Sequence, residues 1–326
     1  MKRELIAGTL FCAPAVTTNV AQSGDPLPSW NEGKSKQAIL TFVATVTKPG
    51  SPGFVPVAER IATFDNDGTL WAEQPVVQGA FLMYQLSKLA QKDPSIRQRQ
   101  PFKAAFEHDQ DYLKEEGMAA ILELFSATHA GMSEEAFDAD VKNFFAAVQH
   151  PTLKRPFQQV AYQPMLELLQ YLRANGFKTF ICSGGGIDFM RVIAMELYGI
   201  PPEQVIGSSQ QKALQQVDGR WGLTRSGKVD SFNDKEVKPV NIDLHIGRKP
   251  LLAAGNERSG GDIGMLRYSQ SRTGPSLQLL VNHNDAGREF SYAEPDNASL
   301  NATTQSGWTV ISMKDDWKTI FPPERK

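Results

Sequence analysis

Residues 60–69 read RIATFDNDGT, a short run of mostly apolar residues followed at once by a turn rich in aspartate. The run predicts a buried strand, and the chain must leave it where the polar residues begin. Asp65 and Asp67 stand two residues apart, so both carboxylates can approach one site if the backbone turns after the strand. Gly68 permits that turn, and the hydroxyl of Thr69 can hydrogen-bond back into it.

Two carboxylates so arranged suit phosphoryl transfer. One can attack phosphorus and form an aspartyl-phosphate, while the other protonates the leaving oxygen and later deprotonates a water molecule. Their charges, added to that of a phosphate, call for a divalent cation, and Mg²⁺ fits oxygen ligands best. A plain Asp-Gly hairpin turn remains an alternative. A calcium-binding EF-hand loop does not, because Leu70 and Val76 replace its glycine and glutamate.

The composition describes an ordinary soluble globular chain and excludes several partners. The 326 residues are 41% hydrophobic and 21% charged, with a formal net charge of −2, which gives no argument for nucleic acid or an acidic membrane surface. This length allows a large α/β core with a smaller second domain. After the N-terminus, no segment approaches the roughly 20 apolar residues of a membrane span.

The N-terminal residues are typical of an export signal. Lys2 and Arg3 precede a mildly apolar run over residues 5–16, and small residues follow near residue 21. Glu4 interrupts this layout, and a disordered arm is the alternative. We therefore expect export to the periplasm or out of the cell, without excluding the cytoplasm. Cys12 and Cys182, the two cysteines, have no metal-ligand spacing.

The chain changes its periodicity twice. A helix is expected over residues 34–46, and residues 74–175 are almost wholly helical in pattern, with Ser133 as an N-cap. Short strands then alternate with helices, and Asp218-Gly219 marks a hairpin. The expected strands after the first cover residues 178–182, 205–209, 214–217, 221–224, 251–254, 277–281 and 308–312. This alternation predicts an α/β fold with a Rossmann-like, doubly wound parallel sheet.

Ligands of such sheets bind at the carboxyl ends of the strands, and three further loops there carry suitable residues. Ser183-Gly184-Gly185-Gly186 offers a hydroxyl and backbone N–H groups for an anion. Lys238, next to Pro239 at a helix start, can neutralise phosphate, with Lys235 and Lys249 as rivals. Asn256 and Asp262, after the 251–254 strand, can complete a metal shell. A glycine-rich turn, a solvated lysine and a flexible loop are the respective alternatives.

Together, and in this order, these motifs resemble the haloacid dehalogenase superfamily over about residues 60–270. The resemblance implies that Asp65 is the nucleophile, that Asp67 is the general acid and base, and that Ser183, Gly184, Thr69 and Lys238 bind phosphate. It also implies Mg²⁺ bound by Asp65, the main-chain carbonyl of Asp67 and Asp262, with Asn256 as a further candidate ligand. A second aspartate at position 67 is a feature of the phosphatases in this superfamily rather than of its dehalogenases.

The sequence departs from the family pattern at its last motif. Asn256 replaces the first aspartate of the usual Gly-Asp-x-x-x-Asp, and two extra residues precede Asp262, which leaves the metal ligands open. Residues 73–75 (Glu-Gln-Pro) and 307–310 (Gly-Trp-Thr-Val) resemble exported bacterial acid-phosphatase-like and phosphoserine-phosphatase-like members. His283 lies in another such stretch and is a candidate for assisting the leaving group, with a surface role as the alternative.

These observations predict a phosphatase for a small phosphorylated molecule. The expected domains are residues 1–25 as export signal or arm, 26–72 and 175–326 as α/β core, and 73–174 as a helical cap, with Glu73 and the cap helices as the source of specificity. A phosphotransferase or mutase, and a non-catalytic phosphate-binding protein, stay open. A phosphonate hydrolase would need a cap lysine; those available are Lys88, Lys92, Lys103 and Lys114. The substrate and the oligomeric state are not predicted.

Overall fold

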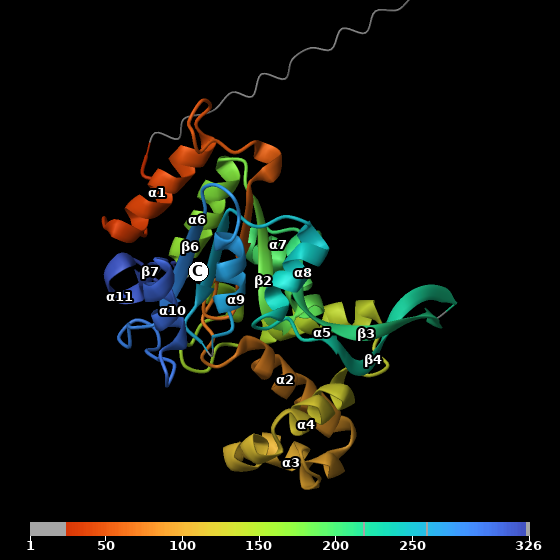
Figure 1. The fold of residues 1–326 in the computed structure, drawn as a ribbon. Coiled ribbons are helices and arrows are strands. Elements are labelled where there is room, and N and C mark those ends of the chain that lie inside the picture. Colours follow the sequence, from red (N-terminus) through yellow and green to blue (C-terminus); the bar gives the residue numbers. More distant parts are fainter. Residues whose placement is uncertain (1–23, 218, 259, 324–326) are drawn as a thin grey trace, which may run out of the picture.

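A single mixed sheet forms the centre of the molecule (Figure 1). The computed structural model describes residues 24–217, 219–258 and 260–323. The strands are β1 (Ile61–Phe64), β2 (Lys178–Gly186), β3 (Val205–Val217), β4 (Arg220–Ser231), β5 (Leu252–Asn256), β6 (Leu277–Asn282) and β7 (Thr309–Ser312). Their order is β4-β3-β2-β1-β5-β6-β7, and only the β3–β4 pair is antiparallel. The predicted Rossmann-like parallel sheet is confirmed.

This strand order fixes where a ligand can bind. From β1 the chain builds outward through β2 and β3, and then returns to the other side of β1 to add β5, β6 and β7. The direction of growth therefore reverses between β1 and β5, which leaves a crevice outside their carboxyl ends. Asp65 follows β1 directly, and Asn256 is the last residue of β5.

Helices cover both faces of the sheet. They are α1 (Lys34–Thr47), α2 (Val77–Lys92), α3 (Phe102–Glu107), α4 (Gln110–His129), α5 (Glu134–Ala147), α6 (Gln163–Ala174), α7 (Ile187–Tyr198), α8 (Val237–Ile246), α9 (Ile263–Gln270), α10 (Ala298–Ser306) and α11 (Met313–Asp316). Successive strand residues point to opposite faces, so Ile181 packs with α1, α6 and α7, whereas Cys182 packs with α8, α9 and α10.

The segment between β1 and β2 is helical, as its sequence predicts. Helices α2, α3 and α4 lie to one side of the sheet (Figure 1) and share a small core of their own that includes Leu86, Phe102 and Leu124. Ser133 caps α5 by accepting a hydrogen bond from the backbone N–H of Ala136 at 3.2 Å. Helix α6, by contrast, packs within the main core beside β2. The division into core and cap domains stays a prediction.

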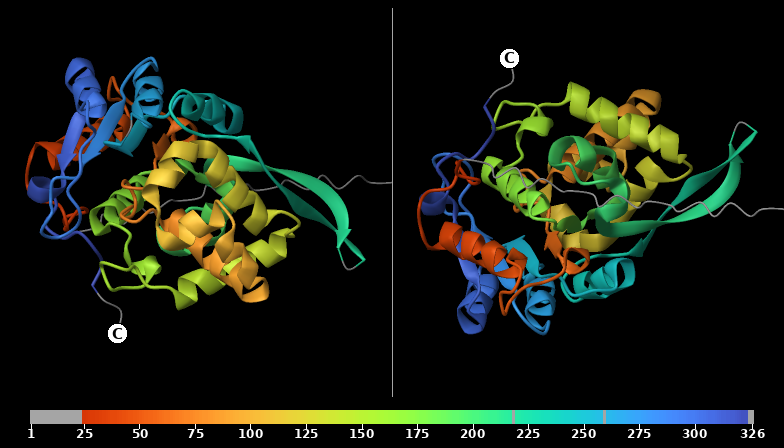
Figure 2. Two further views of the ribbon diagram at one scale, coloured as in Figure 1. Left: turned by 90° about the horizontal axis from the view of Figure 1, so that it is seen from below. Right: turned by 90° about the horizontal axis from the view of Figure 1, so that it is seen from above.

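Two elements differ from the sequence prediction. Strand β2 continues through the glycines to Gly186, because Gly186 still pairs with Ser208 of β3. Helix α8 begins at Val237, so Lys238 lies within its first turn rather than before it. The antiparallel pairing of β3 with β4 confirms the predicted hairpin, but these two strands are longer than expected and project well beyond the rest of the sheet (Figures 1 and 2).

The predicted export signal lies almost wholly outside the described residues, as does Cys12, so its outcome is not decided. Within residues 24–323, apart from 218 and 259, no helix combines the length and the hydropathy needed to cross a bilayer.

Candidate active site

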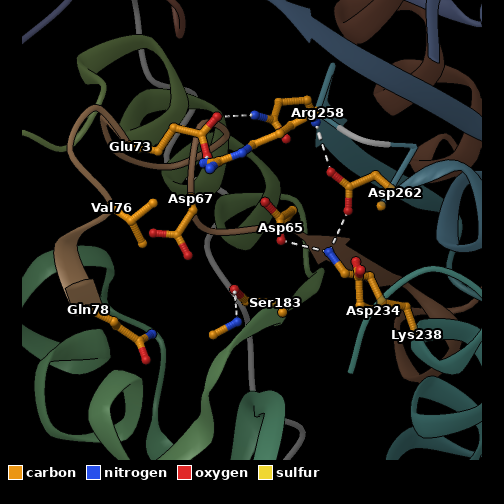
Figure 3. Close-up of a pocket in the computed structure, with 14 residues that line it drawn as sticks. Asp65, Asp67, Glu73, Val76, Gln78, Ser183, Asp234, Lys238, Arg258 and Asp262 are labelled. Atoms are coloured by element: carbon orange, nitrogen blue, oxygen red, sulfur yellow. Dashed lines mark hydrogen bonds and ion pairs between the residues drawn. The ribbon is translucent and has the colours of Figure 1, made fainter. Parts of the chain in front are cut away.

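A cavity of about 270 Å³ opens at the carboxyl ends of β1, β2 and β5 (Figure 3). It collects side chains from four separate stretches of the chain, and most of the residues predicted from the sequence motifs are among them. Its walls include Asp65, Asp67, Glu73, Gln78, Ser183, Gly184, Lys238, Asn256, Arg258 and Asp262. The four motif loops therefore meet at one place, as parallel strands require.

Lys238 connects two of the carboxylates. Its ammonium donates to Asp65 Oδ1 at 2.7 Å and also to Asp262 Oδ1 (Figure 3). All three side chains are buried. Lys238 comes from the first turn of α8, Asp65 from the end of β1 and Asp262 from the start of α9. Of the rival lysines, Lys235 is exposed and does not line the cavity, and Lys249 donates to the carbonyl of Ser271 elsewhere.

The charges in this cluster do not balance without a further cation. Burial and the neighbouring charge of Asp262 raise the pKa of Asp65 well above its usual value, and burial also raises the pKa of Asp262. Burial alone would lower the pKa of Lys238, but the charges of Asp262 and Asp65 outweigh it and raise that pKa. Lys238 is thus held protonated between two buried carboxyl groups, and a further cation would be needed for both of them to be ionised at once.

Asp67 has a different environment. Its Oδ1 accepts a hydrogen bond from the indole N–H of Trp71 at 2.7 Å. Burial nevertheless raises the pKa of Asp67 to about 6, with the charge of Glu73 acting in the same direction. A carboxyl group with such a pKa holds a proton often enough near neutral pH to act as a general acid.

The loop between Asp65 and Trp71 is tightly turned. The carbonyl of Asn66 accepts from the backbone N–H groups of Thr69, Leu70 and Trp71. Gly68 has φ +73°, and a Cβ on it would lie 2.0 Å from Nδ2 of Asn256. Only glycine permits both this conformation and this approach of β5.

Replacement of Gly68 by Ala is therefore expected to lower the free energy of unfolding by more than the roughly 1–3 kcal/mol that left-handed backbone strain typically costs, because the added methyl group also meets Asn256. The added methyl group would also push Asn256 away from the loop, so activity should fall as well. Chemical denaturation of the two proteins measures the first effect. Gly219→Ala is the matched control, since Gly219 has φ +78° but nothing within 4 Å of an added Cβ. Equal losses in both variants would argue against the close approach at Gly68.

Gly255 allows the second close approach in the site. A Cβ there would lie 2.6 Å from the carboxylate carbon of Asp262. In its absence, Asp262 Oδ2 accepts the backbone N–H of Asn256 at 3.0 Å, which fixes that carboxylate against the end of β5. Asp262 therefore reaches the end of β5 despite the two extra residues that precede it in the sequence.

Glu73 organises a network that sequence reasoning largely missed. Its Oε1 accepts from Asn256 Nδ2 at 3.0 Å and from the hydroxyl of Tyr292, and its Oε2 pairs with Arg258. Glu73 is buried, so these partners fix both of its oxygens. Arg258 lies within the last motif, between Asn256 and Asp262, but the sequence indicates no role for it. Tyr292 lies outside all of the motifs.

Of the two hydroxyl residues expected to bind phosphate, only Ser183 lines the cavity. Ser183 lines the cavity and its hydroxyl accepts the backbone N–H of Gly185 at 3.1 Å, which leaves its own proton available for a ligand. Thr69 does not line the cavity. Contrary to expectation, its buried hydroxyl has no hydrogen-bond partner among the described residues, and only its backbone N–H bonds within the turn.

His283 lies behind the loop from Asp65 to Trp71. It is buried, does not line the cavity, and approaches the carbonyl of Gly68 through Nε2 at 2.8 Å and Glu289 through Nδ1 at 3.3 Å. Since a carbonyl oxygen only accepts, Nε2 carries a proton and donates it to Gly68. His283 thus supports the loop from behind. It is not a surface residue, and its place gives no support to a contact with the leaving group.

The atoms at this cavity that could coordinate a metal suit Mg²⁺. They are oxygen atoms, the ligands that this ion prefers. One oxygen of Asp65 is held by Lys238, and the amide nitrogen of Asn256 is held by Glu73. The other oxygen of each, Oδ2 of Asp65 and Oδ1 of Asn256, forms no hydrogen bond with any described residue, and the uncompensated negative charge favours a cation. These oxygens fit the metal that the motifs imply. Among the described residues, however, no group of three or more Asp, Glu, His or Cys side chains is arranged as a metal site, so Asn256 and a main-chain carbonyl would have to complete the ligand set.

Comparison with known proteins assigns the family. The profile of the haloacid dehalogenase-like hydrolases matches residues 62–267. That match covers more than half of the 326 residues, so the chain belongs to this family of hydrolases and the predicted superfamily is confirmed. No curated protein matches the sequence.

One solved structure with a TM-score above 0.5 agrees on the fold. A conserved protein of unknown function from Anaerococcus prevotii DSM 20548 has a TM-score of 0.56 at 15% identity, covering 87% of this chain and 94% of its own. A protein of unknown function from Bordetella pertussis Tohama I has a TM-score of 0.48 at 16% identity, covering 78% and 98%. A phosphoserine phosphohydrolase-like protein from Francisella tularensis subsp. tularensis SCHU S4 has a TM-score of 0.41 at 16% identity, covering 77% and 94%.

Proposed function

We propose that the chain is a Mg²⁺-dependent phosphatase that hydrolyses a small phosphomonoester through an aspartyl-phosphate on Asp65. The observation that carries the proposal is the pairing of two carboxylates with different environments in one cavity. Lys238 donates to Asp65 at 2.7 Å and favours the ionised form of that carboxylate against the effect of burial, whereas Asp67 accepts from Trp71 and has a pKa of about 6. The different environments thus suit Asp65 to act as the nucleophile and Asp67 to act as the acid, within one loop.

In the first step, one carboxylate oxygen of Asp65 attacks phosphorus, and the bond from phosphorus to the ester oxygen breaks. Asp67 gives its proton to that oxygen, so the alcohol leaves neutral. Lys238 and the hydroxyl of Ser183 offer donors to the phosphoryl oxygens, where negative charge is concentrated in the transition state.

In the second step, Asp67, now a carboxylate, takes a proton from a water molecule as that water attacks phosphorus. The bond from phosphorus to Asp65 breaks, inorganic phosphate leaves, and both aspartates return to their starting states. Asp65, Asp262, the main-chain carbonyl of Asp67 and Asn256 would hold the Mg²⁺. When bound, the ion would neutralise the carboxylates and the phosphoryl oxygens so that two anions can approach.

Removal of the metal tests the proposal directly. We expect phosphate release from an aryl phosphate ester to fall by about 100-fold or more in chelator and to return on addition of Mg²⁺. The assay measures inorganic phosphate with time. Calcium serves as the control cation, because it binds oxygen ligands with a looser geometry and should restore little activity. Full activity in chelator would contradict the proposed metal dependence. Transfer of the phosphoryl group to a second alcohol, rather than to water, would identify a phosphotransferase.

The role of Asp67 predicts a dependence on the leaving group. In Asp67→Asn, kcat/KM for an alkyl phosphate should fall by about 10²–10⁴, the usual contribution of a general acid. The loss should be much smaller for a nitrophenyl phosphate, because that leaving group departs without a proton. Steady-state kinetics with both esters give the two ratios, and equal losses would show that Asp67 does not act as the acid.

A further inference from the structure

A second cavity, of about 300 Å³, adjoins the catalytic one. It lies between helices α2, α4 and α5 on one side and strands β2, β3 and β4 on the other. Gln78, Gly184 and Gly185 line both cavities. A phosphoryl group held at Asp65 would therefore have its ester oxygen near this boundary, with the rest of the substrate free to extend into the second cavity.

The walls of the second cavity are mainly apolar. Helices α2, α4 and α5 contribute Phe81, Leu82, Leu122, Phe125 and Phe137. Cavities of this size and composition suit small organic ligands. An apolar cavity of about 150 Å³ already binds benzene, so this one has room for a larger aryl or alkyl group.

No unpaired charge was found on these walls. Among the described residues that line the cavity, the ionisable ones are Asp188 and His129. Asp188 is paired with Lys212 at 2.7 Å and with Arg225 at 3.1 Å. His129 stacks on Phe125 with ring centroids 4.1 Å apart, and burial lowers the pKa of its imidazole to about 4, so the ring is neutral. An ammonium or carboxylate group on a ligand would find no free counter-charge.

The polar atoms on these walls are few and mostly occupied. The hydroxyl of Ser208 donates to the carbonyl of Gly184, and that of Ser209 to Asp230. Two buried atoms have no partner among the described residues, Gln78 Nε2 and Gln210 Oε1. Sugars and nucleosides, which carry many hydroxyl or ring polar groups, would therefore leave most of their hydrogen bonds unmade.

Gln78 stands at the boundary between the cavities. Its Oε1 accepts the backbone N–H of Gly186 at 2.8 Å, which fixes the amide, and its Nε2 lies against Gly185. Figure 3 shows this side chain on the side of the catalytic cavity away from Lys238. The free N–H donor is thus placed where an ester oxygen would pass from one cavity to the other.

We propose that the second cavity binds the leaving group, and that the substrate is a phosphate monoester of an uncharged, apolar alcohol. This inference rests on the proposed phosphatase function and adds the chemical class of the substrate. The apolar part would fill the space between α2, α4 and α5, while Gln78 would donate to the ester oxygen.

The test is a series of straight-chain alkyl phosphates, from ethyl to hexyl, assayed with Mg²⁺. Their alcohols have similar acidity, so differences in kcat/KM report binding of the chain rather than leaving-group chemistry. We expect kcat/KM to rise about fourfold per methylene group, the usual gain for apolar burial, and to exceed the values for glycerol phosphate, phosphoserine and phosphocholine.

Leu122→Asp places a charge on the cavity wall and should abolish this dependence on chain length. Met118→Asp is the matched control, since Met118 lies on the same helix, is 55% exposed and does not line the cavity; the dependence should persist there. Leu122→Asn repeats the test without a charge if Leu122→Asp does not fold.

The outcomes separate the two proposals. Turnover of alkyl and polar esters at similar rates, or a preference for phosphocholine, would overturn the apolar substrate class and leave the phosphatase standing. The same holds if Leu122→Asp and Leu122→Asn keep the dependence on chain length. Absence of phosphate release from every ester would overturn the phosphatase proposal, and this inference with it.

Discussion

Replacement of Asp65 by Asn is expected to lower kcat/KM for phosphate esters by about five orders of magnitude, a loss typical of removing a catalytic nucleophile. The amide retains the size of the carboxylate and one acceptor oxygen, but it has no charge with which to attack phosphorus. Phosphate release, followed with enough enzyme to detect residual turnover, measures the loss.

The same variant should remain folded, which separates a chemical role from a structural one. Burial and the charge of Asp262 raise the pKa of Asp65, so its ionised form costs more in the folded chain than in the unfolded chain. Asn carries no such cost and can still accept from Lys238. We therefore expect the free energy of unfolding in chelator to be equal to or greater than that of wild type.

Asp243→Asn is the control for this experiment. Asp243 is exposed on α8, the helix that carries Lys238, and it does not line the catalytic cavity. Its replacement changes the net charge by the same amount and should change kcat/KM by less than about twofold. Asp65→Asn with turnover near that of wild type would refute the assignment of the nucleophile.

The fold was predictable because its signals are local. Short apolar runs, a Ser133 N-cap and an Asp-Gly hairpin each act within a few residues, and all three have the predicted secondary structure. The extension of β2 through its glycines was not predictable, because only the pairing of Gly186 with Ser208 of a later strand keeps that segment extended.

The residues of the candidate site also fall into those that the sequence predicts and those that it does not. Asp65, Ser183, Lys238 and Asp262 could be gathered from sequence, since each follows a strand or opens a helix and parallel strands bring such positions together. The partners of Glu73 could not. Tyr292 bonds with Glu73 across 219 residues of sequence, in a loop that bears no motif. Contacts of that kind depend on the packed arrangement of the whole chain.

Replacement of Lys238 by Met is the second large effect that we expect, and it should appear in both stability and activity. Asp65 and Asp262 would lose the cation between them while both remain buried. Removing one partner of a buried ion pair costs about 3–5 kcal/mol, so the free energy of unfolding in chelator should fall by that amount. The loss of a phosphate ligand should lower kcat/KM by about 10³.

A second substitution distinguishes electrostatics from packing as the cause. In the double variant Lys238→Met, Asp262→Asn, one of the two stranded charges is gone, so most of the lost stability should return, whereas activity should not. A coupling of this kind between contacting residues is measured by a double-mutant cycle. Lys235→Met is the control, because Lys235 is exposed, and it should change neither quantity. If the double variant were as unstable as the single one, Lys238 would stabilise the fold through packing rather than through its charge. Its charge would then contribute only to binding of the substrate.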